Sequence, residues 1–243
     1  MPSNEDSTSG QSQSQPGRSP QEKFVLIWEA LKRSLLSAEI LLKNTYAELD
    51  GIARDIDAGK VIEDRAAAPL ISCLGFIDFA FRFKSLMDNL PMVSNRRPDM
   101  VRVQQALESV EEARHRIQHL RGELGTNEPV DYPILGSISW MAGNGVYSMA
   151  LGTPIGKVEW PSLVFDRQQG KWTAAHIYKL KNAVVDLDVV IAEMRAAYNS
   201  VADSMTSPHP ESDEFKALKA LKWGTTFALK MQIGAPTQAP ATE

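Results

Sequence analysis

The feature that constrains the fold most is a helical repeat of apolar residues that begins just after Ser19. Ser19-Pro20-Gln21-Glu22 combines a capping hydroxyl, a proline at the first helical position and a glutamate three residues after the cap. The apolar residues that follow recur at steps of three and four up to Asp50-Gly51: Val25, Trp28, Leu31, Leu35, Ala38, Leu42 and Tyr46. The sequence therefore predicts a long amphipathic helix from 20 to about 50, with a shorter helical piece up to Gly59.

Three more helices are indicated by the same kind of pattern. One runs from Pro69 to Asn89 and is apolar around most of its circumference, so it is expected at the centre. Its Asp78 and Arg82, four residues apart, are expected to neutralise each other. The third spans Pro98 to Gly125, and the fourth, from 177 to 201, has the most regular apolar seam.

Between the third and fourth helices, from Tyr132 to Trp172, the helical periodicity vanishes. Asn144-Gly145 separates two short apolar runs as a hairpin turn does, and Gln168-Gln169-Gly170 predicts a second hairpin. The predicted fold is mostly α, an antiparallel helix bundle with a small β-hairpin insertion (about 132–172) before the last long helix. Residues 19–233 are expected to form a single domain ending in a short helix at 215–221, with disordered tails at 1–18 and 234–243.

Composition excludes several classes of function. The chain has 243 residues, a net charge of −4 and one cysteine, Cys73, so a disulfide framework and a cysteine-based zinc cluster are ruled out. The mild acidity argues against a protein that coats nucleic acid by bulk charge. The most apolar segment, 66–81, contains Pro69 and Asp78 and is too short to span a bilayer. A soluble, cytoplasmic protein without membrane contact or cofactor is expected.

One cluster carries possible chemistry, at the end of the third predicted helix. Two of the four histidines, His115 and His119, lie here with Arg114, Arg116 and Arg121. Arg114 continues the apolar seam of its helix, so a permanently charged guanidinium is directed toward the bundle. Such a group is costly unless it meets an anion, a carboxylate or water.

Two interpretations of the cluster need no enzyme. In the first, Arg114 pairs with Glu111 one turn back, or with an acid such as Asp186 across the bundle, and the histidines are ordinary surface residues. In the second, His115 and His119, at positions i and i+4, share a zinc ion. Arg116 occupies the place of the glutamate in His-Glu-x-x-His, so that metalloprotease motif is absent.

The third interpretation is a resemblance. Arg114-His115-x-x-x-His119, near the C-terminal end of a bundle helix, resembles the Arg-x4-6-His signature of the HEPN superfamily of helical-bundle proteins, whose second position is typically polar. The resemblance covers residues 19–125 and the fourth helix, and it leaves the β insertion outside. It implies a metal-independent endoribonuclease in stress or phage defence, in which the 2′-hydroxyl of RNA attacks its own phosphate at a cleft shared by two subunits.

The resemblance also implies roles for the cluster. His119 would be the general acid and base, Arg114 would bind the scissile phosphate, and His115 would orient the pair. Arg116 and Arg121 would add positive potential for RNA. RNA and a second copy of the chain are then the expected partners. The alternative is a non-enzymatic homodimeric or partner-binding module, marked by a carboxylate partner for Arg114 within the same subunit and by solvent-exposed histidines.

Overall fold

The computed structural model describes residues 19–62, 65–91, 93–94, 96–125, 133–143, 145–150, 161, 163, 165–167, 171–172 and 175–206. Four helices, a four-stranded antiparallel sheet and a separate two-stranded sheet make up this part of the chain. The mostly α fold, with β structure before the last helix, is confirmed. The predicted tails at 1–18 and 234–243 and the predicted short helix at 215–221 lie outside the described residues.

Helix α1 (Pro20–Asp57) begins with the predicted capping box. The Ser19 hydroxyl accepts a hydrogen bond from the Glu22 backbone N–H (3.2 Å), and the Glu22 carboxylate accepts one from the Ser19 N–H (2.9 Å). The helix does not end at Asp50-Gly51, because Leu49 and Ile52 are fully buried and continue the apolar seam. Their burial outweighs the cost of about 1 kcal/mol that a glycine imposes inside a helix.

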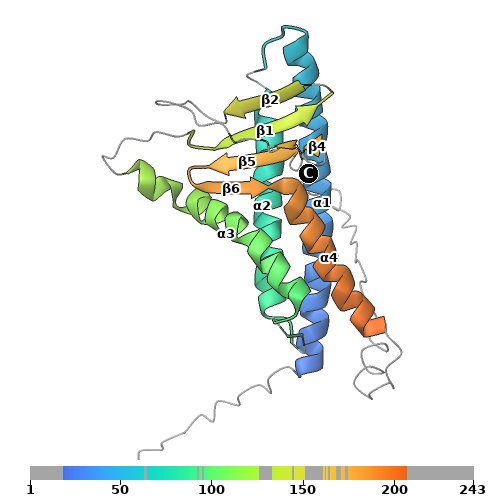
Figure 1. The fold of residues 1–243 in the computed structure, drawn as a ribbon. Coiled ribbons are helices and arrows are strands. Elements are labelled where there is room, and N and C mark those ends of the chain that lie inside the picture. The colour runs from blue at the N-terminus through green and yellow to red at the C-terminus, as the bar shows by residue number, and fades with distance from the viewer. Residues whose placement is uncertain are drawn as a thin grey trace, which may run out of the picture.

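Helix α2 (Ala67–Asp88) packs along α1, and its buried face includes Phe76, Ile77 and Phe83, none of which is exposed to solvent. Helix α3 (Pro98–Leu124) and helix α4 (Leu187–Thr206) complete the bundle. In Figure 1 the chain runs up α1 and down α2, which lie antiparallel, then rises obliquely across α2 in α3 and descends again in α4.

The main sheet has the strand order β2-β1-β5-β6, and every neighbouring pair is antiparallel. Its strands are β1 (Ser137–Ala142), β2 (Gly145–Ala150), β5 (His176–Leu180) and β6 (Ala183–Asp186). The predicted hairpin between 134–141 and 146–151 is confirmed as β1 and β2. The second predicted hairpin is confirmed as β3 (Phe165–Asp166) paired with β4 (Lys171–Trp172).

The prediction of one helix from 177 to 201 is wrong in its first part. The predicted end of the β insertion at 172 is therefore wrong as well. Residues 176–186 form the β5–β6 hairpin, with Lys181 at a φ of +54° in its turn. Burial in this hairpin follows the alternation of a strand, because Ala183 and Val185 are buried while Val184 is 47% exposed. The Asp186 carboxylate then accepts the N–H groups of Asp188 and Val189, which starts α4.

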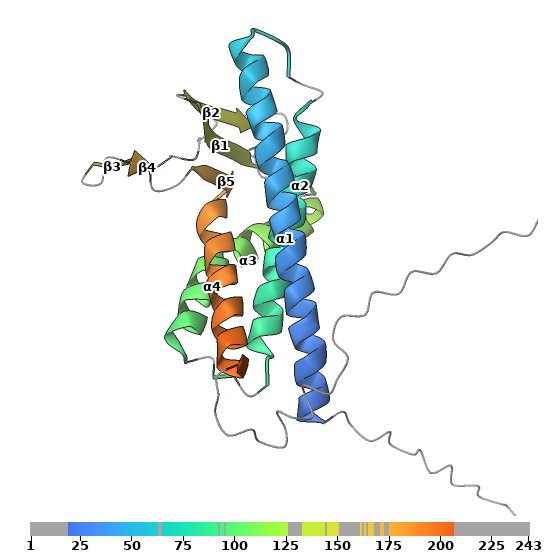
Figure 2. The same cartoon turned by 90° about the vertical axis from the view of Figure 1, so that its right-hand side faces the viewer.

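The sheet and the last two helices share one side of the α1–α2 pair. Figure 1 shows the sheet across the upper half of this pair and α3 and α4 across the lower half. Figure 2, turned by 90°, shows the sheet and α4 on the same side of α1. The N-terminus of α4 therefore lies where the sheet, α1 and the lower helices meet, and the hydrogen bond from Tyr46 on α1 to Asp188 on α4 marks this junction. The opposite edge of the sheet is held to the C-terminal end of α1, where Tyr147 of β2 donates to Asp57.

Candidate functional site

Arg114 of α3 lies against α2 and has a carboxylate partner in the same subunit. Its Nε donates to Asp78 Oδ1 (3.1 Å), one of its terminal nitrogens donates to Gln118 Oε1 (3.2 Å), and its Cζ lies 4.0 Å from the centre of the Phe81 ring. The side chain is 23% exposed. The partner is neither of the acids that sequence analysis suggested. Glu111 pairs with Lys84 (2.8 Å) instead, and Asp186 caps α4.

Asp78 is shared between two guanidinium groups. Its other oxygen accepts a hydrogen bond from Arg82 Nε at 2.7 Å, which confirms the predicted pairing of Asp78 with Arg82. One carboxylate thus balances two permanently charged side chains, and the group formed by Asp78, Arg82 and Arg114 keeps one excess positive charge at the α2–α3 surface.

The two histidines of the cluster lie on the outer surface of α3. His115 and His119 are both exposed, and the centres of their rings are 4.2 Å apart with the planes tilted by 46°. Arg116 pairs with Glu112 (3.0 Å). The backbone of Arg121 belongs to α3, but its side chain lies outside the described part of the structure.

The structure brings together some of the predicted site residues but not the predicted catalytic pair. The two imidazoles contact each other, whereas Arg114 contacts Asp78, Gln118 and Phe81, and no hydrogen bond or ring contact joins Arg114 to His119 in the described structure. Within the same residues no group of three or more histidine, cysteine or acidic side chains is placed to hold a metal ion.

A second polar cluster, not anticipated from the sequence, lies at the N-terminus of α4. Asp188 accepts hydrogen bonds from the Tyr46 hydroxyl (2.5 Å), from His176 Nδ1 (3.1 Å) and from the backbone N–H groups of Ala175 and His176 (3.3 and 3.1 Å). The Tyr46 ring stacks on the His176 imidazole, with the ring centres 3.7 Å apart. The Asp188 carboxylate thus joins α1, β5 and the N-terminus of α4.

The surroundings shift the ionisation of this cluster. Burial, reinforced by the hydrogen bond to Asp188, raises the pKa of the Tyr46 hydroxyl above its ordinary value. Burial alone would raise the pKa of Asp188, but the hydrogen bonds from His176 and Tyr46 outweigh it and lower the pKa. Burial raises the pKa of the neighbouring Asp186. Asp188 is therefore a stable carboxylate that orients the imidazole through Nδ1 and leaves Nε2 without a hydrogen-bond partner among the described residues.

Sequence reasoning missed this cluster because it treated 177–201 as one helix, which hid the strand that carries His176. The available signal was Asp186-Leu187-Asp188, since two acids at the cap and in the first turn are typical of a helix start.

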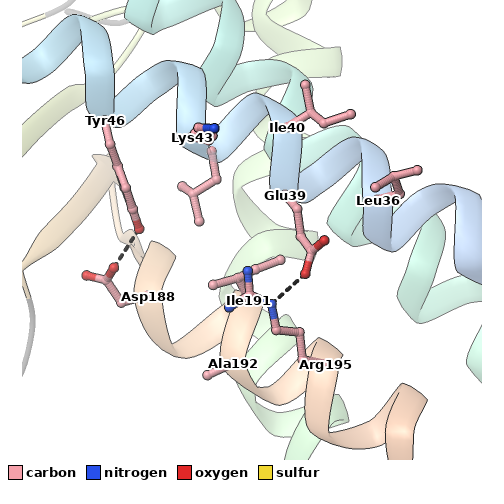
Figure 3. A pocket seen from close by; sticks show the side chains of 10 residues that line it. Leu36, Glu39, Ile40, Lys43, Tyr46, Asp188, Ile191, Ala192 and Arg195 are labelled. Atoms are coloured by element: carbon pink, nitrogen blue, oxygen red, sulfur yellow. Dashed lines mark hydrogen bonds and ion pairs between the residues drawn. The ribbon is translucent and has the colours of Figure 1, made fainter.

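A groove of about 570 Å³ opens between α1 and α4 beside this cluster. Figure 3 shows its two ends. At one end Tyr46 is hydrogen bonded to Asp188, and at the other Glu39 is paired with Arg195, whose Nε lies 2.5 Å from Glu39 Oε1. The full set of lining residues is Leu36, Glu39, Ile40, Leu42, Lys43, Tyr46, Asp188, Ile191, Ala192 and Arg195.

Comparison of the chain with protein-family models, with curated proteins and with solved structures found no match. The HEPN resemblance therefore stays a prediction. None of the helices is long and apolar enough to cross a membrane, as far as the described residues go.

Proposed function

We propose that this chain is a non-enzymatic helical interaction module, with a second copy of the chain as its partner. The observation that supports the proposal is the use of Arg114 inside its own subunit, by Asp78, Gln118 and the Phe81 ring. A guanidinium engaged in this way contributes to the packing of α3 on α2. The exposed His115 and His119 then serve as surface side chains of α3.

The experiment measures the assembly and the activity of the same preparation. Light scattering coupled to size-exclusion chromatography is expected to give twice the chain mass of 26.8 kDa. Incubation with tRNA, mRNA and rRNA in EDTA is expected to leave all three intact. A monomer at every concentration tested would contradict the homodimer, and cleavage of RNA would contradict the non-enzymatic role.

One observation favours a second candidate, the RNA-acting function that the resemblance implies. The excess positive charge on the group of Asp78, Arg82 and Arg114 is one that a phosphate could neutralise. In this role Arg114 would exchange part of its contact with Asp78 for the phosphate, and His119 would exchange protons with the substrate.

Cleavage by this second candidate must survive EDTA and must be lost in both Arg114→Ala and His119→Ala. His176→Ala is the matched control, because His176 lies in the separate cluster at α4 and its hydrogen bonds and ring contact go to Asp188 and Tyr46, not to α3. Cleavage that persists in either α3 variant would reject the assignment of those residues.

A further inference from the structure

The groove between α1 and α4 has an apolar floor between two polar ends. Leu42 and Ile191 line it and are only 4% and 6% exposed, so their side chains form its base. Leu36 and Ile40, about half exposed, extend the apolar surface along α1. A volume of about 570 Å³ lies within the range of sites that hold small organic molecules.

The hydrogen-bond donors of the groove are not all used. Arg195 contacts Glu39 through Nε, which leaves both terminal amino groups of its guanidinium without a partner among the described residues. Figure 3 shows the Arg195 side chain reaching from α4 toward Glu39 on α1. Lys43, exposed at the rim one turn along α1 from Glu39, likewise has no ion-pair partner in the described structure.

The two carboxylates of the groove already have partners. Glu39 accepts from Arg195, and Asp188 accepts from Tyr46, from His176 and from two backbone N–H groups. Glu39 uses only Oε1 in this pair and its charge balances that of Arg195, so Lys43 carries the unbalanced positive charge at this end of the groove. The donors left over the apolar floor are those of Lys43 and the terminal amino groups of Arg195. Donors of this kind bind carboxylate and sulfonate groups through charge-assisted hydrogen bonds.

We infer that the α1–α4 groove is a binding site for a small amphipathic anion. Its acidic head group contacts Lys43 and the free amino groups of Arg195, and its aliphatic or aromatic body covers Leu42 and Ile191. This inference goes beyond the proposed interaction function and does not depend on it, because it concerns a different face of the molecule from the α3 cluster.

The test uses the full chain and 1-anilinonaphthalene-8-sulfonate, a fluorescent amphipathic anion, with decanoate as competitor. Saturable binding at one site, displaced by decanoate, is expected. Lys43→Gln is expected to weaken binding about three- to tenfold, because it removes one charge-assisted contact. Lys43→Arg keeps the charge and is expected to keep most of the affinity. Lys32→Gln, an exposed lysine of α1 that does not line the groove, is the matched control and is expected to change nothing.

Two further competitors separate the contributions of head and body. Decanol lacks the charge and acetate lacks the chain, so both are expected to displace the probe much less well than decanoate. Far-ultraviolet circular dichroism verifies that each variant is folded. Equal binding by wild type and Lys43→Gln, equal competition by decanol and decanoate, or no saturable binding to the full chain would each overturn the inference.

Discussion

Arg114 and Asp78 join α3 to α2 through a hydrogen-bonded ion pair, with the guanidinium stacked against the Phe81 ring. The pair is partly exposed, at 23% for Arg114 and 34% for Asp78. Water therefore screens the attraction, and the flat guanidinium gains from the aromatic face as well as from the carboxylate. This relationship accounts for a charged residue beside the buried face of α3, next to the fully buried Ala113, without requiring a ligand.

The coupling between these two side chains is expected to be measurable. Asp78→Asn and Arg114→Gln are each expected to lower the free energy of unfolding by about 1 kcal/mol, and the double variant by less than the sum. Urea denaturation of the four proteins gives the interaction energy. Arg82→Gln, which removes the other partner of Asp78 on the same helix, is the control and is expected to cost about 0.3–0.5 kcal/mol. Strict additivity would show that the ion pair contributes nothing.

Asp188 is expected to make stability depend on acidity. Its pKa in the folded protein lies below the ordinary value of 3.8, so its hydrogen bonds stabilise the fold above that pH and are lost as the pH falls through the lowered value. Asp188→Asn is expected to cost about 1–3 kcal/mol at pH 7. The difference between the two proteins should shrink toward pH 2, as urea denaturation at several pH values would reveal.

Asp186 provides the contrast for this experiment. Burial raises the pKa of Asp186, so the ionisation of this carboxyl group opposes folding. A loss of folding stability at low pH therefore cannot come from Asp186. A difference between wild type and Asp188→Asn that stays constant from pH 7 to pH 2 would argue that Asp188 is not ionised in the folded protein.

Local patterns were sufficient to predict most of the helical structure. The capping box at Ser19, the apolar seam of α1 and the proline at the start of α3 each act within a few residues, so the sequence contains their cause. The same holds for the β1–β2 hairpin, whose strand pairing closes at Ala142 and Gly145.

The errors occurred where distant residues decide the outcome. Ile177 and Leu180 fit a helical seam, but β5 pairs with β1, about 40 residues earlier in the chain, and this pairing sets their conformation. The partner of Arg114 depends on how α2 and α3 align, and the contact from Tyr46 to Asp188 spans 142 residues. No spacing rule within a single element contains that information.

The indole N–H of Trp140 on β1 is buried and has no hydrogen-bond partner in the described structure. Trp140→Phe removes this donor together with some packing, so the two effects partly offset each other and the cost is expected to stay below about 1 kcal/mol. Tyr178→Phe is the matched comparison, because the equally buried Tyr178 hydroxyl donates to the Leu135 carbonyl (3.0 Å). Loss of this hydrogen bond in Tyr178→Phe is expected to lower the free energy of unfolding by about 1–2 kcal/mol. Thermal and urea unfolding would measure both, and the reverse order would contradict the assignment of the unpaired donor.

Gly136, immediately before β1, has a φ of +85°, and a Cβ there would lie 2.7 Å from the Lys179 backbone oxygen and 2.7 Å from the Tyr178 hydroxyl. Gly136→Ala therefore combines backbone strain with a collision against β5, and it is expected to lower the free energy of unfolding by about 3 kcal/mol or more.

Gly59 separates these two contributions, because its φ of +68° is similarly left-handed but nothing lies within 4 Å of the added Cβ. Gly59→Ala is expected to cost only about 1 kcal/mol, the strain alone. Urea denaturation of both variants gives the difference, which measures how tightly the entry to β1 packs on β5. Equal costs for the two substitutions would mean that the sheet yields at this point, and that its position against α1 is set elsewhere.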